Sequence, residues 1–226
     1  MNQTDASLEA AEFHEASGSP GASGSPGASG FDRIAAPYDR GMAPLEKLAL
    51  RRLRSRLLSF AQGRVLEIGV GTGANLPYYP GSACLAAIDE SAGMVAVAAR
   101  RATTLGRCVS LGQMSVEALG FAGGLFDTVV VSLVLCSVIS QRRALGEIRR
   151  VLRKPEGRLL LLEHMRPRDH NLAWLVDRVN GPWVALNGRC HLNRETQQTL
   201  VQAGFQLEWV ESKLGGFLRL IAARPS

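Results

Sequence analysis

The segment of residues 65–80, VLEIGVGTGANLPYYP, restricts the fold of this chain more than any other. Three of its first four residues are apolar, which predicts a short strand buried on both faces of a parallel sheet. Glu67 interrupts this strand, and a buried carboxylate costs several kcal/mol unless a partner compensates it. The glycines that follow allow a tight turn and a close approach to a ligand. We therefore expect a ligand-binding turn at the end of this strand, formed by Glu67, Gly69, Gly71 and Gly73.

A second apolar run, residues 84–88, ends in Asp89, about twenty residues after the turn, where a carboxylate can accept both hydroxyls of a ribose. The G-x-G start of the turn is shared with dinucleotide-binding proteins. Those sites, however, do not need an acidic residue just ahead of the first glycine, where this chain has Glu67 two positions before Gly69. Phosphorylated cofactors also usually leave Arg or Lys near the glycines, and none lies between Val65 and Glu90. The pattern therefore favours a nucleoside over a dinucleotide.

Together these motifs resemble those of the class I S-adenosylmethionine-dependent methyltransferases, and the resemblance runs from Phe31 to the C-terminus. It implies an α/β, Rossmann-like fold: a doubly wound, mostly parallel sheet with helices on both faces. It also implies that S-adenosyl-L-methionine is the cofactor. The glycine turn would pass under the amino-acid half of this cofactor, and Asp89 would bind its ribose.

The resemblance implies further contacts around the adenine. Residues 115–121, SVEALGF, stand where many relatives have D-A-E-x-L-P-F, so Ser115 replaces the aspartate that accepts from the adenine amino group. A neutral hydrogen bond is about half as strong as a charge-assisted one. Adenine recognition would therefore lean on the backbone near Val116 and on apolar contact from Met94. Leu133, at the end of a further apolar run, is included in the same expected set.

Residues 31–40, FDRIAAPYDR, resemble an entry segment that folds over the cofactor in methyltransferases of quinones, lipids and small molecules. In such enzymes a tyrosine, here Tyr38, approaches the methionine end of the cofactor. An ordinary helix that ends before Pro44 is the alternative. We expect residues 31–62 to form cap helices at the start of a domain that extends to residue 226.

The first thirty residues differ in composition, because SGSPGA occurs twice in succession and few apolar residues surround it. Such a segment cannot bury enough apolar surface to become ordered, so we expect a flexible tail at residues 1–30. The tail has no basic start and no apolar core, which argues against a secretory signal. It carries four acidic residues and no Lys or Arg, so the chain's +6 leaves +10 for the remainder.

The basic remainder favours an anionic surface or substrate, although a solvated basic face explains the charge as well. Residues 45–60 have helical apolar spacing and carry Arg51, Arg52, Arg54 and Arg56, a pattern that can lie on an anionic membrane. We favour packing of this helix against the sheet. No nucleic acid is expected, because no basic run is interleaved with aromatics. The expected location is cytoplasmic, with peripheral contact at the inner membrane face as an option.

The cysteines are widely scattered and form no C-x-x-C pair: Cys84, Cys108, Cys136 and Cys190. This pattern indicates a reducing compartment and argues against disulfides and against a metal site. Cys136 lies in an apolar run, and methyl transfer from a sulfonium needs no enzyme nucleophile. We therefore expect it to be a small core residue.

The remaining elements alternate as in a doubly wound fold. Helices are expected at residues 92–103 and 144–155, strands near residues 108–111 and at 158–164, and a strand with its exit loop at 126–139. Leu135, Cys136 and Ser137 of that loop, together with Glu163 and His164, would face the ligand crevice.

Residues 165–196 fall where this superfamily inserts acceptor-binding elements, and they include two tryptophans and few acids. An apolar acceptor pocket or a lid at a membrane is expected, with an extra core helix as the alternative. His164 and His191 are candidate catalytic bases for an acceptor that must lose a proton, although either can simply be a hydrogen-bonding wall residue. Asn193 is a candidate helix N-cap.

The run LVLCSV, the strand end EH and the segment HLNRET resemble a narrower group, which includes animal alkyl-thiol methyltransferases and bacterial quinone and phospholipid methyltransferases. The resemblance implies methyl transfer to a small lipophilic acceptor: an alkyl thiol, a lipid amine or a quinol. The animal members begin with a membrane anchor, where this chain has the GASGSP tail. A non-catalytic S-adenosylmethionine-binding module and an NAD-linked oxidoreductase are the alternatives.

Overall fold

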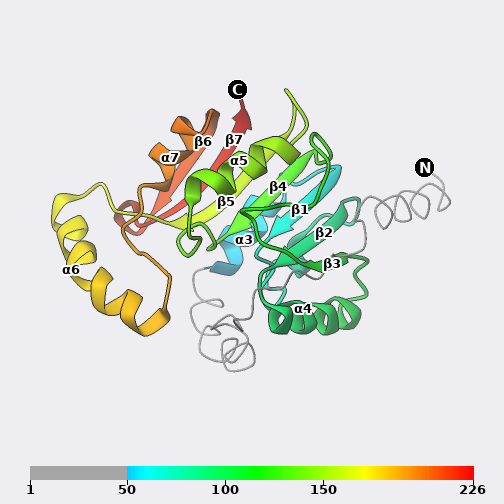
Figure 1. Cartoon of the computed structure of the whole chain (residues 1–226), viewed down its shortest axis with the longest axis horizontal. Helices are drawn as coiled ribbons and strands as arrows, with labels where there is room; N and C mark the ends of the chain where they lie inside the picture. Colours follow the sequence, from blue (N-terminus) through cyan, green and yellow to red (C-terminus); the bar gives the residue numbers. More distant parts are fainter. Residues whose placement is uncertain (1–49) are drawn as a thin grey trace.

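The computed structural model describes residues 50–226 of the chain, and Figure 1 shows how their elements are arranged. Seven strands of this part form one sheet with the order β3-β2-β1-β4-β5-β7-β6. All pairs are parallel except those of β7, which runs antiparallel to both neighbours. The strands are β1 (Arg64–Ile68), β2 (Cys84–Asp89), β3 (Ser110–Gln113), β4 (Thr128–Ser132), β5 (Arg158–His164), β6 (Phe205–Lys213) and β7 (Leu218–Pro225).

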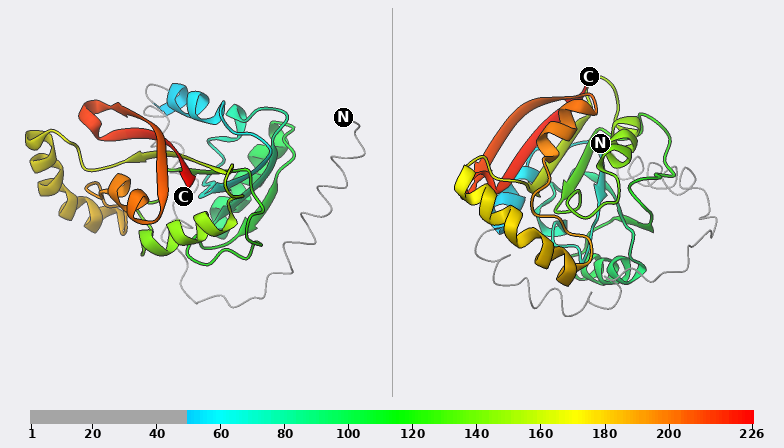
Figure 2. Two further views of the ribbon diagram at one scale, coloured as in Figure 1. Left: turned by 90° about the horizontal axis from the view of Figure 1, so that it is seen from above. Right: turned by 60° about the vertical axis from the view of Figure 1, so that its left-hand side comes forward.

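Helices cover both faces of the sheet (Figure 2). The α-helices are α3 (Arg51–Leu58), α4 (Ala92–Thr104), α5 (Gln141–Val151), α6 (His170–Asn187) and α7 (Thr196–Gln202). Short 3₁₀ helices are η3 (Leu76–Tyr78) and η4 (Leu214–Gly216). Buried residues of α5 and α7 join one core with alternate residues of the central strands. Those of α3 and Ala102 of α4 join the core on the opposite face. The expected Rossmann-like fold is confirmed.

The apolar runs that predicted strands form the centre of the sheet. β4 is buried along its whole length and β5 in all but its terminal residues, as expected for parallel strands covered on both sides. The strand expected at residues 158–164 matches β5. Within residues 126–139 only 128–132 pair in the sheet, and the following residues form the exit loop.

The capping residue marks the observed start of helix α5 more accurately than the apolar spacing does. α5 begins at Gln141 because the Ser140 side chain accepts a hydrogen bond from the Arg143 amide. It ends at Val151, before the expected Pro155. The strand expected near residues 108–111 is shifted, because β3 starts at Ser110.

The basic helix expected at residues 45–60 is described only from residue 50, and α3 covers Arg51–Leu58. Leu57 and Leu58 are fully buried, so the favoured packing against the sheet is confirmed. One assignment on this helix was wrong. Arg54 is not on the basic outer face but is buried beside the glycine turn. Tyr38, the expected tail and most of the expected cap lie outside the described residues.

Residues 165–196 contain α6, an 18-residue helix that stands beyond the end of the sheet (Figure 1). Several of its large apolar side chains are exposed, among them Trp174 and Leu186. The proposal of Asn193 as an N-cap was wrong, since α7 begins after Glu195 and the Asn193 amide donates to Asp177 instead. Among the described residues, no helix has the length and apolar character that crossing a membrane requires.

Candidate functional site

A cavity of about 240 Å³ opens at the carboxyl ends of β1, β2 and β4, where parallel α/β sheets bind their ligands. The glycine turn forms its floor, the segment after β3 one side, and the loop after β4 the other. Most of the predicted cofactor residues line it: Glu67, Gly69, Gly71, Asp89, Met94, Ser115, Val116 and Leu133. Gly73 belongs to the turn but is not among the lining residues, and Tyr38 lies outside the described part.

The glycine turn needs the conformational freedom of its glycines. Gly69, Gly71 and Gly73 have φ values of 71°, 53° and 79°, in the left-handed region that L side chains rarely adopt. A Cβ on Gly69 would come within 2.2 Å of Val134 Cγ2, whereas one on Gly71 would meet nothing within 4 Å. The turn therefore packs against the loop after β4 at Gly69 and leaves open space at Gly71.

Asp89 bonds to the turn through one carboxylate oxygen and to the start of α4 through the other. Oδ2 accepts a hydrogen bond from the Gly71 amide at 2.9 Å, and Oδ1 accepts one from the Ser91 amide at 2.9 Å. Asp89 thus links the end of β2 to both the turn and the start of α4, whose N-cap is Ser91.

Glu67 is buried beneath the turn, in a chain of polar side chains that the sequence did not reveal. Its Oε1 accepts from Asn75 Nδ2 at 2.8 Å, and Asn75 Oδ1 accepts from Arg54 at 2.7 Å. Asn75 also donates to Ser132 Oγ at 3.1 Å. Burial raises the pKa of Glu67 from its ordinary 4.5 to about 7, against the opposing effects of Asn75, Tyr79 and Arg54. The arrangement compensates only part of the cost of burying this carboxylate.

The second carboxylate oxygen of Glu67, Oε2, indicates which kind of ligand the cavity fits. Oε2 is buried and has no partner with hydrogen-bond geometry among the described residues, although the Tyr79 hydroxyl approaches the carboxylate. Both Glu67 and Arg54 line the cavity. A buried, under-satisfied acceptor suits a ligand that brings a donor or a positive charge. The amino-acid half of S-adenosylmethionine carries both, so the residues present fit this cofactor.

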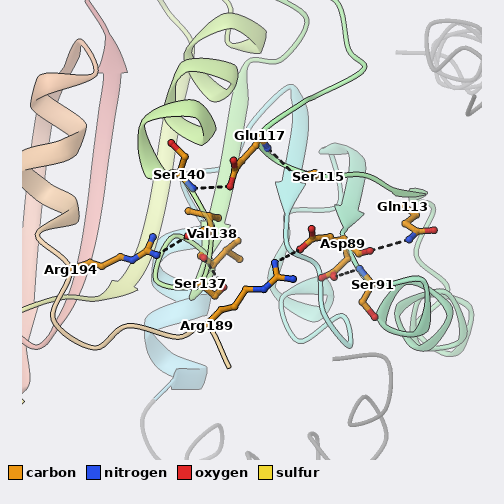
Figure 3. Close-up of polar contacts among 12 residues, drawn as sticks. Asp89, Ser91, Gln113, Ser115, Glu117, Ser137, Val138, Ser140, Arg189 and Arg194 are labelled. Atoms are coloured by element: carbon orange, nitrogen blue, oxygen red, sulfur yellow. Dashed lines mark hydrogen bonds and ion pairs between the residues drawn. The ribbon is translucent and has the colours of Figure 1, made fainter. Parts of the chain in front are cut away.

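The segment after β3 forms an apolar and weakly polar side wall. Met94 of α4 is buried, and Met114 and Val116 lie along the same wall. The Ser115 hydroxyl accepts a hydrogen bond from the Glu117 amide at 3.3 Å. Glu117 is tied down as well, because its Oε1 accepts from the Ser140 amide at 2.9 Å (Figure 3). The Glu117 side chain thus joins this wall to the start of α5.

The loop after β4 forms the opposite wall. Leu133 begins it with a φ of 59°, which is uncommon for a residue other than glycine and marks a constrained backbone. Glu163 of β5 fixes the next two residues, since one carboxylate oxygen accepts from the amides of Val134 and Leu135 at 3.0 and 2.7 Å. Glu163 is fully buried and does not line the cavity, so the expectation that it faces the crevice was wrong.

The mouth of the cavity is bordered by the segment that follows α6. Arg189 reaches across toward the end of β2 and pairs with Glu90 at 3.4 Å (Figure 3). Arg194 donates to the carbonyls of Leu135 and Val138 at 2.8 and 2.7 Å. The segment after α6 is therefore attached to the loop after β4 through Arg194.

The two candidate bases do not line the cavity among the described residues. The amide of His191 donates to the Cys136 carbonyl at 2.9 Å. The His164 ring stacks on Phe217 at a centroid distance of 5.5 Å. Their catalytic assignment remains a hypothesis.

The structure brings His164 together with two cysteines that the sequence suggested were unrelated. Cys190 Sγ lies 3.3 Å from His164 Nε2 and 3.8 Å from Cys136 Sγ. The contact with Cys136 has the largest effect and lowers the pKa of the Cys190 thiol. Burial opposes this effect, and the contact with His164 lowers the pKa further. Burial lowers the pKa of His164, but Cys190 and Glu163 outweigh it and raise that pKa overall. Spacing along the chain could not reveal this cluster, because 54 residues separate the two cysteines.

Comparison with known proteins agrees with this geometry. A family model described as a methyltransferase domain matches residues 66–161, which include the glycine turn, Asp89 and the loop after β4. A thiol S-methyltransferase of Homo sapiens is 34% identical over 183 residues, covering 76% of this chain and 72% of that protein. This chain belongs to the class I S-adenosylmethionine-dependent methyltransferases. The class uses S-adenosylmethionine as its methyl donor, so S-adenosylmethionine is the cofactor implied for this chain.

Other relatives of this methyltransferase carry names with different acceptors. A thiol S-methyltransferase of Rattus norvegicus is 36% identical over 154 residues, covering 64% of this chain and 62% of that protein. The chain thus spans less than two thirds of that relative's length. A ubiquinone/menaquinone biosynthesis C-methyltransferase of Pseudomonas savastanoi is 31% identical over 221 residues, covering 84% of this chain and 85% of that protein.

Solved structures show the same fold. An S-adenosylmethionine-dependent methyltransferase of Thermotoga maritima superposes with a TM-score of 0.65 at 22% identity, covering 87% of this chain and 98% of that one. A [4+2]-cyclase superposes with a TM-score of 0.63 at 18% identity, covering 78% of this chain and 79% of that one. The fold alone therefore does not determine the reaction.

Proposed function

We propose that this methyltransferase transfers the methyl group to a small lipophilic acceptor, and that an alkyl thiol is the first candidate ahead of a lipid amine or a quinol. The observation that carries the proposal is the apolar wall beside the glycine turn, made by Leu133, Val134, Val138 and Ile139. Such a wall accommodates an uncharged acceptor better than a hydrophilic one. The names of the thiol, phospholipid and quinone relatives support the same class of acceptor.

In this proposal the cofactor residues divide by the part of the ligand they bind. Asp89, at the end of β2, accepts the ribose hydroxyls. Met94, Ser115 and Val116 hold the adenine. The amino-acid half lies over Gly69, Gly71 and Gly73, with Glu67 beneath, and the methyl group points to Leu133. Tyr38 is a further candidate for the methionine end.

The cofactor supplies an electrophilic methyl group on a sulfonium. The protein's task is to hold the acceptor in line with it in a water-poor site, and orientation of this kind can supply roughly 7–11 kcal/mol. A thiol must also lose its proton, and His164 and His191 are the candidate bases. His164 is the last residue of β5, and the His191 amide donates to the Cys136 carbonyl in the loop after β4.

The exposed apolar side of α6 supports a lipophilic acceptor that arrives from a membrane surface. Trp174, Leu175 and Leu186 are about half or more exposed, at 62%, 49% and 82%. Tryptophan suits the boundary between lipid and water. We therefore propose a cytoplasmic enzyme that touches the inner membrane face through α6.

The test is transfer of labelled methyl from S-adenosylmethionine to a matched panel: an alkyl thiol, phosphatidylethanolamine vesicles, a demethylated quinol and a hydrophilic amine. Product on the thiol supports the proposal, and product on lipid or quinol alone replaces its first candidate. Transfer only to the hydrophilic amine would contradict a lipophilic acceptor. Sedimentation with anionic vesicles, compared between the wild type and Leu186→Ser, tests the membrane contact separately.

A further inference from the structure

We propose that Cys136, His164 and Cys190 are the three protein ligands of a zinc ion, and that its fourth position takes the acceptor as a thiolate. The second half of this proposal rests on the thiol acceptor proposed above, whereas the first half does not. The three residues come from three separate parts of the fold: the loop after β4, the end of β5 and the segment after α6.

The donor atoms already have the spacing of a metal site. One donor atom from each residue lies within 4.8 Å of the other two. With Zn–S bonds of about 2.3 Å and Zn–N bonds of about 2.0–2.1 Å, a tetrahedral ion sets two sulfurs about 3.8 Å apart and sulfur from nitrogen about 3.6 Å. The two sulfurs lie 3.8 Å apart, and Cys190 Sγ lies 3.3 Å from His164 Nε2. The two distances at Cys190 therefore differ from those of a tetrahedral zinc site by no more than a few tenths of an ångström.

The chemistry of the donor set selects the ion. Two thiolates and one imidazole are ligands that zinc favours, and three protein ligands leave a coordination position open. Two thiolates carry −2 between them, which a dication neutralises. That matters here because Cys136 is only 2% exposed and unpaired thiolates would be costly to bury.

Charged neighbours of the cluster are already engaged. The Glu163 carboxylate accepts the amides of Val134 and Leu135, and Arg194 donates to two carbonyls of the same loop. Glu163 also contacts Cys136 and adds negative charge beside the cluster, whereas none of these contacts joins the Arg194 guanidinium to a cysteine sulfur. The stacking of His164 on Phe217 fixes the plane of the imidazole.

The site lies beside the cavity. One sequence neighbour of each of two ligands lines that cavity: Ser137 next to Cys136, and Arg189 next to Cys190. A thiol that takes the open position passes its proton to water and binds as thiolate, so His164 acts here as a ligand and not as the base. In the transfer, a sulfur lone pair forms the new bond to the methyl carbon, and the electrons of the broken methyl–sulfonium bond stay on the departing thioether.

The first experiment measures metal without cofactor or acceptor. The full chain is purified without chelators, its zinc is quantified by mass spectrometry, and the metal-free protein is titrated with zinc against a chromophoric competitor. We expect one zinc per chain. Cys190→Ser should lower the zinc affinity by more than about 100-fold, beyond the effect of removing a residue that only hydrogen-bonds a ligand. Cys108→Ser is the matched control, because Cys108 is an exposed free cysteine outside the cluster, and it should bind zinc like the wild type.

X-ray absorption of the zinc-loaded wild type provides a readout that no variant can obscure. We expect two sulfur scatterers at about 2.3 Å and nitrogen or oxygen at about 2.0–2.1 Å. A wild type that binds no zinc, or a Cys190→Ser variant that binds it unchanged, overturns the site. So does rapid formation of a Cys136–Cys190 disulfide by mild peroxide that zinc does not slow.

Cobalt-substituted protein then tests the fourth position. Addition of an alkyl thiol should strengthen the thiolate-to-cobalt charge-transfer band, and S-methylated thiol should not. An unchanged spectrum with metal bound overturns the acceptor half alone. Metal binding without methyl transfer to any thiol overturns the thiol as the first candidate acceptor and leaves the zinc site standing.

Discussion

The glycine turn, which lines the cavity, and helix α6, which precedes the segment at the cavity mouth, are built in opposite ways. Around the turn, polar side chains are buried and bonded to one another, as in the series Arg54, Asn75 and Glu67. On α6, large apolar side chains face outward. In the proposed function the first region is a preformed cofactor site, and the second is a surface whose final surroundings are supplied by what it binds. Substitutions should therefore affect stability and cofactor binding in the first region, and acceptor or membrane affinity in the second.

The strongest test of the preformed cofactor site is Gly69→Ala. The left-handed backbone costs about 1–2 kcal/mol for a residue with a Cβ, and forcing that Cβ against Val134 adds about 1–3 kcal/mol. We expect a loss of about 2–5 kcal/mol in the free energy of unfolding and at least a tenfold loss of cofactor affinity. Denaturant unfolding and calorimetry measure these. Gly71→Ala is the matched control and should show the backbone cost alone, so equal losses would contradict the packing argument.

The next largest effect is the pH dependence that Glu67 gives to stability. Its pKa is raised from 4.5 to about 7 by burial, so the folded state favours the protonated carboxyl. This contribution is fully present below about pH 4.5 and is lost as the pH rises through 7, which amounts to about 3 kcal/mol at most. Glu67→Gln should remove that decline. Urea unfolding at pH 5 and pH 8 measures it, and an equally steep decline in the variant would refute the assignment.

Asp89→Asn should have an effect of about 1.5–3 kcal/mol on cofactor binding, because charged hydrogen bonds to two amides are weakened. That corresponds to roughly a 10- to 150-fold higher dissociation constant. Glu90→Gln is the control, since this side chain is 56% exposed at the rim and its pair with Arg189 is long. We expect less than a threefold change there. Similar losses in both variants would place the ribose contact elsewhere.

The smallest effect on stability should come from α6. Leu186 is 82% exposed, so Leu186→Ser should change the free energy of unfolding by less than about 0.5 kcal/mol. Its affinity for anionic vesicles, or for a lipophilic acceptor, should nevertheless fall. Leu105→Ser alters another exposed leucine, at the end of α4, and should leave both affinities unchanged. A loss of stability with Leu186→Ser would mean that this face of α6 is already packed.

The sequence predicted what is local or periodic. The buried strands β1, β2 and β5 follow from short apolar runs, and the turn follows from its glycines and the acidic residues beside it. The sequence did not predict Asn75 as the partner of Glu67, because an asparagine in a turn-rich segment has several ordinary explanations. The sequence did not predict that Arg54 is buried, because helical spacing identifies an apolar stripe and not a single buried arginine. Cys190, His164 and Cys136 meet only through the topology of the sheet.

The loop after β4 contacts both the glycine turn and the segment that follows α6. Val134 packs against the glycine turn at Gly69, while the carbonyls of Leu135, Cys136 and Val138 accept bonds from Arg194 and His191. An acceptor that orders the segment after α6 would therefore also bias the wall against which the cofactor rests. By linkage, cofactor and acceptor would then change one another's affinity by the same factor, so the two ligands would bind cooperatively even without touching.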